Sequence, residues 1–209
     1  MGVAIRTAGE GDRELVVRLL DEAFQDDPVS RWVFPGEEYR RRTHRRLMAA
    51  FTDAVLADGW IDITEDGAAC ALWLSVPEDG HGDGHGGETD EAGADGPAQV
   101  REAVDPDNAR VERIARLTEG IHPSGPAHAY LWMIGVAPGR QGEGLGTALI
   151  ESVLDRCDRE ELPAYLEASS ARSRGLYERL GFEFTGRALD LPDGPRMWPM
   201  WREPRQGAR

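Results

Sequence analysis

The chain has 209 residues, 40% of them hydrophobic and 30% charged, which is typical of a folded globular protein and excludes global disorder. Its 38 acidic residues outnumber 24 basic ones, and the formal net charge of −14 disfavours binding to nucleic acid or to an anionic membrane. Every basic residue is an arginine, which excludes chemistry that needs a lysine, such as a Schiff base or the phosphate-binding lysine of a P-loop.

The first 76 residues predict a short strand, two helices and a hairpin. A strand is expected at residues 3–6, then a helix that Asp12 caps and that ends before Asp26-Asp27-Pro28, because a residue before proline avoids the helical region. A longer helix is expected at 37–56, and strands at 60–64 and 69–76 are joined by a turn at Asp66-Gly67. The longer helix carries a basic run, namely Arg40, Arg41, Arg42, His44, Arg45 and Arg46. A solvated helix face is the favoured interpretation of this run, ahead of a phosphate contact.

Residues 78–96 differ in kind from the rest of the chain. They contain seven glycines, seven acidic residues and no large apolar side chain, which predicts a flexible acidic insertion. His81 and His85 suggest a metal site, but a glycine-rich tract holds ligands poorly, so we favour a linker without metal. Two helices are expected after the insertion, at 98–104 and 108–119.

The second half of the chain alternates strands with helices. Strands are expected at 130–136 and 163–168, with a helix ending near 160 between them. A helix at 173–180, closed by Gly181, precedes strands at 183–191 and 196–202. This order predicts a single α/β domain whose sheet has crossover connections.

A glycine-rich turn lies between the strand at 130–136 and the helix after it. Its sequence is Gln141-Gly142-Glu143-Gly144-Leu145-Gly146. Glycines let a ligand approach the backbone, and the first amides of a helix have no internal partner, so this turn predicts a phosphate or pyrophosphate site. The dinucleotide fingerprint would need glycine where Thr147 stands.

These motifs together resemble the GNAT superfamily of N-acetyltransferases. Val136-Ala137-Pro138 followed by Gln141-x-x-Gly144-x-Gly146 is similar to the family's acetyl-CoA signature, and residues 176–182, Leu-Tyr-Glu-Arg-Leu-Gly-Phe, are similar to its second motif. The tail at 192–198 resembles the branch of the family that contains the puromycin N-acetyltransferases. The likeness is specific over 128–202 and weaker over 1–76.

The resemblance implies one GNAT domain over residues 1–209, with a splayed mixed β-sheet flanked by helices. Residues 1–76 would form the acceptor side, and residues 128–202 the acetyl-CoA-binding core. The backbone of Ile134 and Val136 would pair with pantetheine. The pyrophosphate would be held by the amides of Gln141, Gly142, Glu143, Gly144, Leu145, Gly146 and Thr147. Arg172 is interpreted as a further phosphate contact or as a solvated surface residue.

Two side chains are the candidate catalytic groups. Family likeness assigns the general acid to Tyr177, whose phenol stays protonated at neutral pH and would protonate the leaving thiolate. Glu167 is our first candidate for the base, because a charge in a covered strand is costly without a purpose, although a structural salt bridge is an equal alternative. His128 and Tyr130 are second choices, and Asp26 and Asp27 are expected to line the acceptor side and attract a cation.

The sequence therefore predicts transfer of an acetyl group from acetyl-CoA, without a metal, to a primary amine of a small molecule, with an antibiotic-like amine as one candidate. A protein N-terminal or side-chain acetyltransferase, and an acyl-CoA sensor or scaffold without turnover, remain as alternatives. We expect a cytoplasmic monomer or homodimer that contacts neither nucleic acid nor membrane. No signal peptide is read at the N-terminus, the longest apolar run, 129–137, is too short to span a bilayer, and Cys70 and Cys157 are too few for a disulfide framework.

Overall fold

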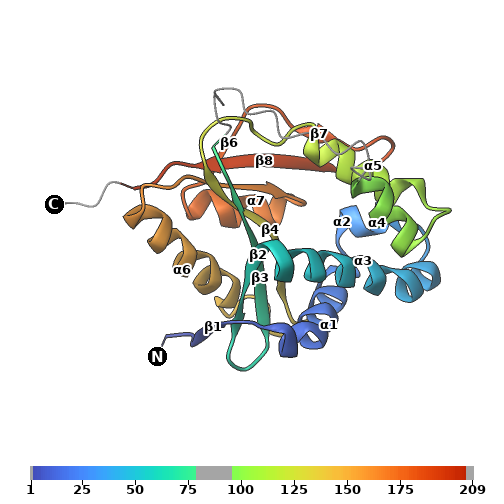
Figure 1. Ribbon diagram of the computed structural model, residues 1–209, viewed down its shortest axis with the longest axis horizontal. Coiled ribbons are helices and arrows are strands. Elements are labelled where there is room, and N and C mark those ends of the chain that lie inside the picture. Colours follow the sequence, from blue (N-terminus) through green and yellow to red (C-terminus); the bar gives the residue numbers. More distant parts are fainter. Residues whose placement is uncertain (1, 79–95, 206–209) are drawn as a thin grey trace, which may run out of the picture.

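The computed structural model describes residues 2–78 and 96–205, which form a mixed sheet covered by helices on both faces (Figure 1). The expected insertion at 78–96, with His81 and His85, lies almost wholly outside the described residues. The helices are α1 (Arg13–Phe24), α2 (Pro28–Val33), α3 (Glu37–Asp58), α4 (Gly96–Val104), α5 (Ala109–Glu119), α6 (Leu145–Arg159) and α7 (Ala171–Arg179). The strands are β1 (Ile5–Thr7), β2 (Gly59–Thr64), β3 (Ala69–Val76), β4 (His128–Val136), β5 (Ala164–Ala168), β6 (Glu183–Phe184), β7 (Leu189–Asp190) and β8 (Arg196–Arg202).

The sheet is splayed between its two central strands, as expected. The strand order is β1-β2-β3-β4-β5-β8-β6, with β7 also paired to β8, and only β4 and β5 run parallel. These two strands pair over three positions, which end at Leu131 and Leu166. On its other side, β4 stays paired with β3 as far as Val136. Among the described strands, the edge of β4 that faces β5 therefore has no partner from Trp132 onward.

Two apolar cores hold the helices on opposite faces of the sheet. α1 and α3 bury one stripe against β2 and β3, including Leu20, Met48 and Val55. α6 and α7 cover the other face, where Leu149 and Ile150 are fully buried. Each such side chain contributes roughly 1.5–3 kcal/mol of transfer free energy. Figure 1 shows α6 on one side of β2 and β3 and α3 on the other.

The elements expected from sequence are mostly present, with three corrections. Asp12 does not cap α1, because its carboxylate binds the Arg6 guanidinium and the amide of Gly9. The strand expected at 183–191 is broken into β6 and β7, and Gly186 between them has a φ of +93°. The expectation missed α2, which starts directly at the proline that ends the preceding segment, because proline is well suited to a first helical position.

The basic run on α3 is only partly solvated, which corrects the expected solvated face. Arg41, Arg42, Arg45 and Arg46 are exposed, but Arg40 and His44 are buried. Residues four apart lie on one helix face, and these two belong to the stripe that also contains Leu47 and Met48. Arg40 donates to the carbonyl of Phe34 at 3.3 Å. The exposed arginines of the run therefore face solvent, while Arg40 binds the end of α2.

Cys70 and Cys157 are buried free thiols, and burial raises the pKa of the Cys70 thiol to about 12. Within the described ranges, no helix combines the length and the apolar character that crossing a bilayer requires.

Gly194 lies so close to Trp32 that we expect Gly194→Ala to destabilise the fold. A Cβ at this position would sit 2.4 Å from Cδ1 of Trp32, whose indole donates to the carbonyl of Pro192 at 2.8 Å. Forcing the ring away costs about 2 kcal/mol, typical of an overpacked site. Gly175→Ala, in an open helical position of α7, is the control and is expected to stabilise by up to about 1 kcal/mol. Urea denaturation of both variants measures the difference, and an unchanged midpoint in Gly194→Ala would contradict this contact.

Candidate active site

The glycine-rich turn presents unpaired backbone amides at the start of α6. Gly139, Gly142 and Gly144 all have positive φ angles, between +83° and +87°. The first amide of this region that bonds inside the helix is that of Ala148, which donates to the carbonyl of Gly144 at 2.9 Å. In the described part of the chain, no hydrogen bond uses the amides of residues 141–147. Unpaired amides at a helix start can bind an anion. The amides of residues 141–147, which we call the cradle, stay the predicted pyrophosphate site.

The same turn is packed onto the free end of β4. A Cβ on Gly146 would lie 3.6 Å from the side chains of both Ile134 and Val136. These two residues pair with Ala71 and Ala69 of β3, and they lie in the part of β4 that β5 does not reach. The predicted pantetheine edge and the predicted pyrophosphate cradle are therefore adjacent.

Charges near the cradle are arranged around Arg140. Its guanidinium pairs with Glu143 at 2.7 Å and with Asp66 at 3.2 Å, which ties the turn to the β2–β3 connection. The Glu143 carboxylate is thereby partly neutralised beside the amides. Arg172 is exposed at the start of α7 and has no ion pair among the described residues, so its role as a phosphate contact stays a prediction.

β4 and β5 separate after Leu131 and Leu166, and we call this place the split. Glu167 is the first residue of β5 beyond it. The hydroxyl of Tyr130 donates to its Oε2 at 2.7 Å, and its buried Oε1 has no partner in the described residues. Burial raises the pKa of Glu167 to about 7, although the bond from Tyr130 opposes the shift. A carboxylate with such a pKa is suited to exchange a proton at neutral pH. The salt bridge considered from sequence has no arginine or histidine partner among the described residues.

The Asp27 carboxylate lies within electrostatic range of Tyr177, near the junction of the α1–α2 connection with the end of β5. Tyr177 is 7% exposed, and its ring lies against Phe182. Burial and the nearby Asp27 carboxylate both raise the pKa of Tyr177, which keeps the phenol protonated. Asp27 accepts a bond from the hydroxyl of Ser169 at 2.7 Å, whereas Asp26 is exposed and pairs with Arg31. The structure therefore places only one of the two aspartates at this junction.

Sequence reasoning missed the aromatic cluster behind Glu167. His128 is 2% exposed, its Nδ1 lies 2.9 Å from the carbonyl of Pro126, and its Nε2 lies 3.1 Å from that of His122. Tyr165 and Trp201 pack against the same rings. The available signal was the strand alternation that puts Tyr165 and Glu167 on one face of β5. His128 is thus held in a packed cluster, while Tyr130 directly contacts the candidate base.

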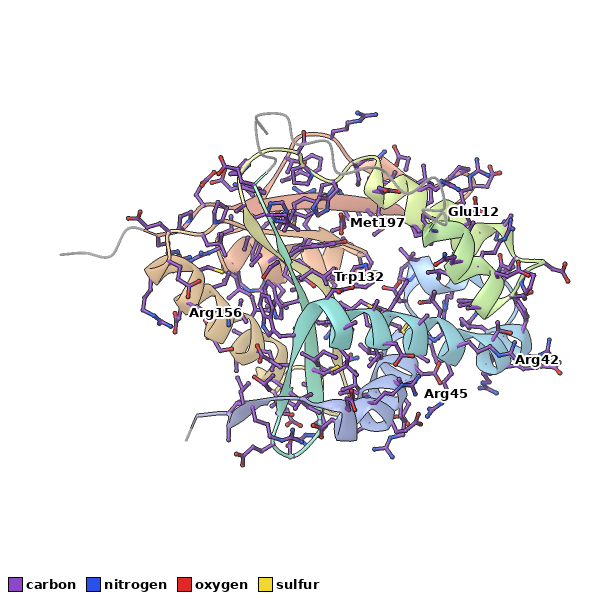
Figure 2. All side chains as sticks on the ribbon, viewed as in Figure 1. Arg42, Arg45, Glu112, Trp132, Arg156 and Met197 are labelled. Carbon is purple, nitrogen blue, oxygen red and sulfur yellow. The ribbon has the colours of Figure 1, made fainter. Side chains whose placement is uncertain are left out.

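Trp132 of β4 lies near the middle of the molecule in the view of Figure 2. It is the first residue of β4 that has no pair on β5, and its ring packs against that of Phe51 of α3, with centroids 4.6 Å apart and planes tilted by 43°. The α1–α3 layer therefore covers the same stretch of β4 that the split leaves without a strand.

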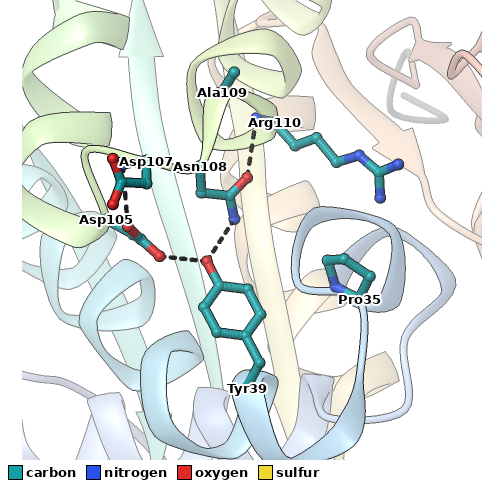
Figure 3. Close-up of a pocket in the computed structure, with 7 residues that line it drawn as sticks. All are labelled: Pro35, Tyr39, Asp105, Asp107, Asn108, Ala109 and Arg110. Atoms are coloured by element: carbon teal, nitrogen blue, oxygen red, sulfur yellow. Dashed lines mark hydrogen bonds between the residues drawn. The ribbon is translucent and has the colours of Figure 1, made fainter.

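A hollow of about 470 Å³ lies elsewhere, between α3 and the α4–α5 connection (Figure 3). Its polar groups bind one another: Tyr39 donates to Asp105, and Asn108 donates to the Tyr39 hydroxyl at 3.0 Å and to the carbonyl of Val33. These bonds lock the surrounding helices together, and we assign the hollow no part in the active site.

Comparison with known proteins agrees with this geometry. The sequence model of the acetyltransferase (GNAT) family matches residues 104–182, which contain β4, the glycine-rich turn, α6, β5 and α7. An uncharacterised N-acetyltransferase of Schizosaccharomyces pombe is 44% identical over 55 residues, which are 26% of this chain and 22% of that protein. A mycothiol acetyltransferase of Beutenbergia cavernae is 47% identical over 57 residues, 25% of this chain and 18% of that protein. The matched segments thus span about a fifth of these relatives.

Solved structures extend the likeness to the whole fold. A structure from Corynebacterium glutamicum, described as histone acetyltransferase HPA2 and related acetyltransferase, has a TM-score of 0.71 at 24% identity and covers 100% of both chains. Arylalkylamine N-acetyltransferase 2 of Aedes aegypti has a TM-score of 0.63 at 16% identity, covering 98% of this chain and 100% of that one. The fold is that of the GNAT acetyltransferases. At the level of sequence, the match to that family's model is confined to residues 104–182.

Proposed function

We propose that this chain is an acetyl-CoA-dependent N-acetyltransferase acting on a primary amine of a small molecule. The observation that carries the proposal is the unpaired edge of β4 lying directly beside the unpaired amides at the start of α6. A strand edge suits the amides of pantetheine, and a helix start suits a pyrophosphate. Backbone groups of Ile134 and Val136 would bind the first, and the amides of residues 141–147 the second.

The side chains around the split would carry out the proton transfers. Glu167 would take a proton from the ammonium group, leaving an amine that forms the new C–N bond as the C–S bond of the thioester breaks. A backbone amide near Val136 would donate to the carbonyl oxygen while it carries negative charge. Tyr177 would give its proton to the departing thiolate, and its phenolate would recover a proton from the nitrogen of the new amide, which must lose one more as the C–S bond breaks. These steps need no metal, and the two free thiols suit the reducing cytoplasm.

A small amine is the acceptor that we favour. Asp27 and Glu167 bring two carboxylates to the junction of the acceptor side with the split, and the net charge of −14 attracts cations. The names of the relatives and structural neighbours indicate different acceptors. They include mycothiol acetyltransferases, arylalkylamine N-acetyltransferases and a ribosomal-protein-S18-alanine N-acetyltransferase. The resemblance of residues 192–198 to puromycin acetyltransferases adds an antibiotic-like amine to the candidates.

An acceptor screen tests the function. The purified chain is mixed with acetyl-CoA and with puromycin, an arylalkylamine, an aminoglycoside or a basic peptide, and both free thiol and acetylated product are measured. Release of thiol with a small amine and the corresponding mass gain support the proposal. Turnover of the peptide alone would assign a protein acceptor, and coenzyme A binding without thiol release would assign a sensor.

Replacing Glu167 by glutamine is expected to remove the acid limb of the pH profile. As the base, Glu167 must be ionised, so kcat/KM should rise with pH through about 7 in the wild type. Glu167→Gln should turn over about 10- to 100-fold more slowly at pH 8, without that limb, because only water then takes the proton. A wild-type profile in the variant would reassign the base.

Although Glu167→Gln should slow turnover, it is expected to gain stability relative to wild type as the pH rises. The raised pKa means that the folded state binds the Glu167 proton more tightly than the unfolded chain does, so this contribution is present below about pH 4.5 and lost as pH rises through about 7. Glutamine carries no charge at any pH. The melting temperature of Glu167→Gln relative to wild type should therefore increase between pH 5 and pH 8.

A further inference from the structure

A chain of hydrogen bonds runs from the interior of the α1–α3 layer to the end of β5. Asp21 of α1 contacts Nδ1 of His44 on α3 at 2.7 Å, and Nε2 of that ring lies 3.0 Å from the hydroxyl of Ser30 on α2. The amide of Ser30 donates to Oδ1 of Asp27 at 3.3 Å, and Oδ2 of Asp27 accepts from Ser169 at 2.7 Å. Five residues, with Ser30 contributing both its hydroxyl and its backbone amide, thus connect three helices of the acceptor side with the end of β5.

The first part of this chain has the order of a catalytic triad, but its surroundings are those of a structural contact. His44 is fully buried, Ser30 is 8% exposed, and the ring of Phe34 packs edge-on against the imidazole. Ser30 does not line the hollow between α3 and the α4–α5 connection. A serine nucleophile needs access to its substrate and an oxyanion hole, so these residues are better explained as a brace for α2.

Asp27 is the residue at which the brace meets the sheet. Its Oδ1 accepts from the amides of Val29 and Ser30, the first amides of α2 that need a cap, and its Oδ2 is held by Ser169. Ser169 follows Glu167 by two residues and precedes Tyr177 by eight. One carboxylate therefore fixes the start of α2 relative to the strand that carries the candidate base and the helix that carries the candidate acid.

We infer that Asp27 is a positioning residue whose bond to Ser169, braced by Asp21, His44 and Ser30, clasps the acceptor-side helices to the end of β5. The clasp sets where an amine held by α1 and α2 lies relative to the split. The contact itself is independent of any activity, but its use in placing an amine rests on the proposed function.

Amide hydrogen exchange at Val29 and Ser30 tests the clasp directly, because Asp27 caps both amides. Ser169→Ala removes the hydroxyl and frees the carboxylate to rotate, so both amides should exchange about 5- to 10-fold faster, as expected for one lost hydrogen bond. Ser169→Thr keeps a hydroxyl and should exchange like wild type. Ser75→Ala, at an exposed position of β3, is the control for a serine lost elsewhere. Unchanged exchange in Ser169→Ala, or equally fast exchange in Ser169→Thr, would overturn the clasp.

A second readout separates positioning from chemistry. With the amine identified by the acceptor screen, Ser169→Ala should raise the KM for the amine about tenfold while kcat at saturating amine and the Kd of coenzyme A stay within about twofold of wild type. Ser30→Ala, which cuts the brace, should change KM in the same direction and less. A fall in kcat with unchanged KM would overturn the positioning role. If the wild type acetylates no amine, the proposed function fails, and the exchange measurement still decides whether the clasp exists.

Discussion

Gly144→Asp is expected to weaken coenzyme A binding by at least about 100-fold. Gly144 precedes the first residue of α6 with a φ of +83°, and a Cβ there would point into open space next to the unpaired amides. A carboxylate at that place lies where the pyrophosphate would sit. At about 5 Å and an effective dielectric constant of about 20, two unit charges repel by about 3 kcal/mol, and each 1.4 kcal/mol is a factor of ten in Kd. Isothermal titration calorimetry with coenzyme A measures the loss.

Two control variants separate charge from backbone strain. Gly144→Ala imposes the same left-handed conformation on a residue with a Cβ, at about 1 kcal/mol, but adds no charge, so its Kd should rise far less. Gly186→Asp places an equal charge at a glycine with a φ of +93° between β6 and β7, and it should leave coenzyme A affinity unchanged. Similar affinities in Gly144→Asp and wild type would show that the start of α6 does not hold the cofactor.

The glycine-rich turn before α6 is a part of the candidate site that the sequence could predict. The cradle is local: a buried strand, a glycine-rich turn and an amphipathic helix follow one another within about thirty residues, so spacing alone indicates an anion site. The structure adds that Ile134 and Val136 lie under the helix start. The strands predicted at 69–76 and 196–202 likewise have the observed bounds of β3 and β8, because each follows a recognisable turn.

The acceptor side depends on contacts between distant residues, and these were not predictable. Asp27 was expected to line this side, but its bond to Ser169 joins positions 142 residues apart. His44 reads as part of a solvated basic run until α1 and α2 are placed around it. The contact of Tyr130 with Glu167 requires the register of β4 on β5, which a single sequence does not contain. The candidate catalytic residues were thus found one by one, and their partners came from the fold.

Tyr177→Phe is expected to lower kcat by about 10²–10³ with little change in the Kd of coenzyme A. The ring would keep its contact with Phe182, so the fold should be preserved while the proton donor is lost. Burial and the Asp27 carboxylate raise the pKa of Tyr177, so the wild-type phenol stays protonated throughout the neutral range and the loss should be the same at pH 6 and pH 8. A factor of 10²–10³ is typical of removing a positioned acid.

Tyr39→Phe is the matched control, since it removes a tyrosine hydroxyl that bonds to Asp105 away from the split. It should leave kcat within about twofold of wild type. Because the departing thiolate needs the proton, Tyr177→Phe should also slow release of free thiol in single-turnover mixtures in which cofactor and amine are already bound. If Tyr177→Phe and Tyr39→Phe had equal kcat values, the acid would have to be another group, and the approach of Asp27 to Tyr177 would then serve packing alone.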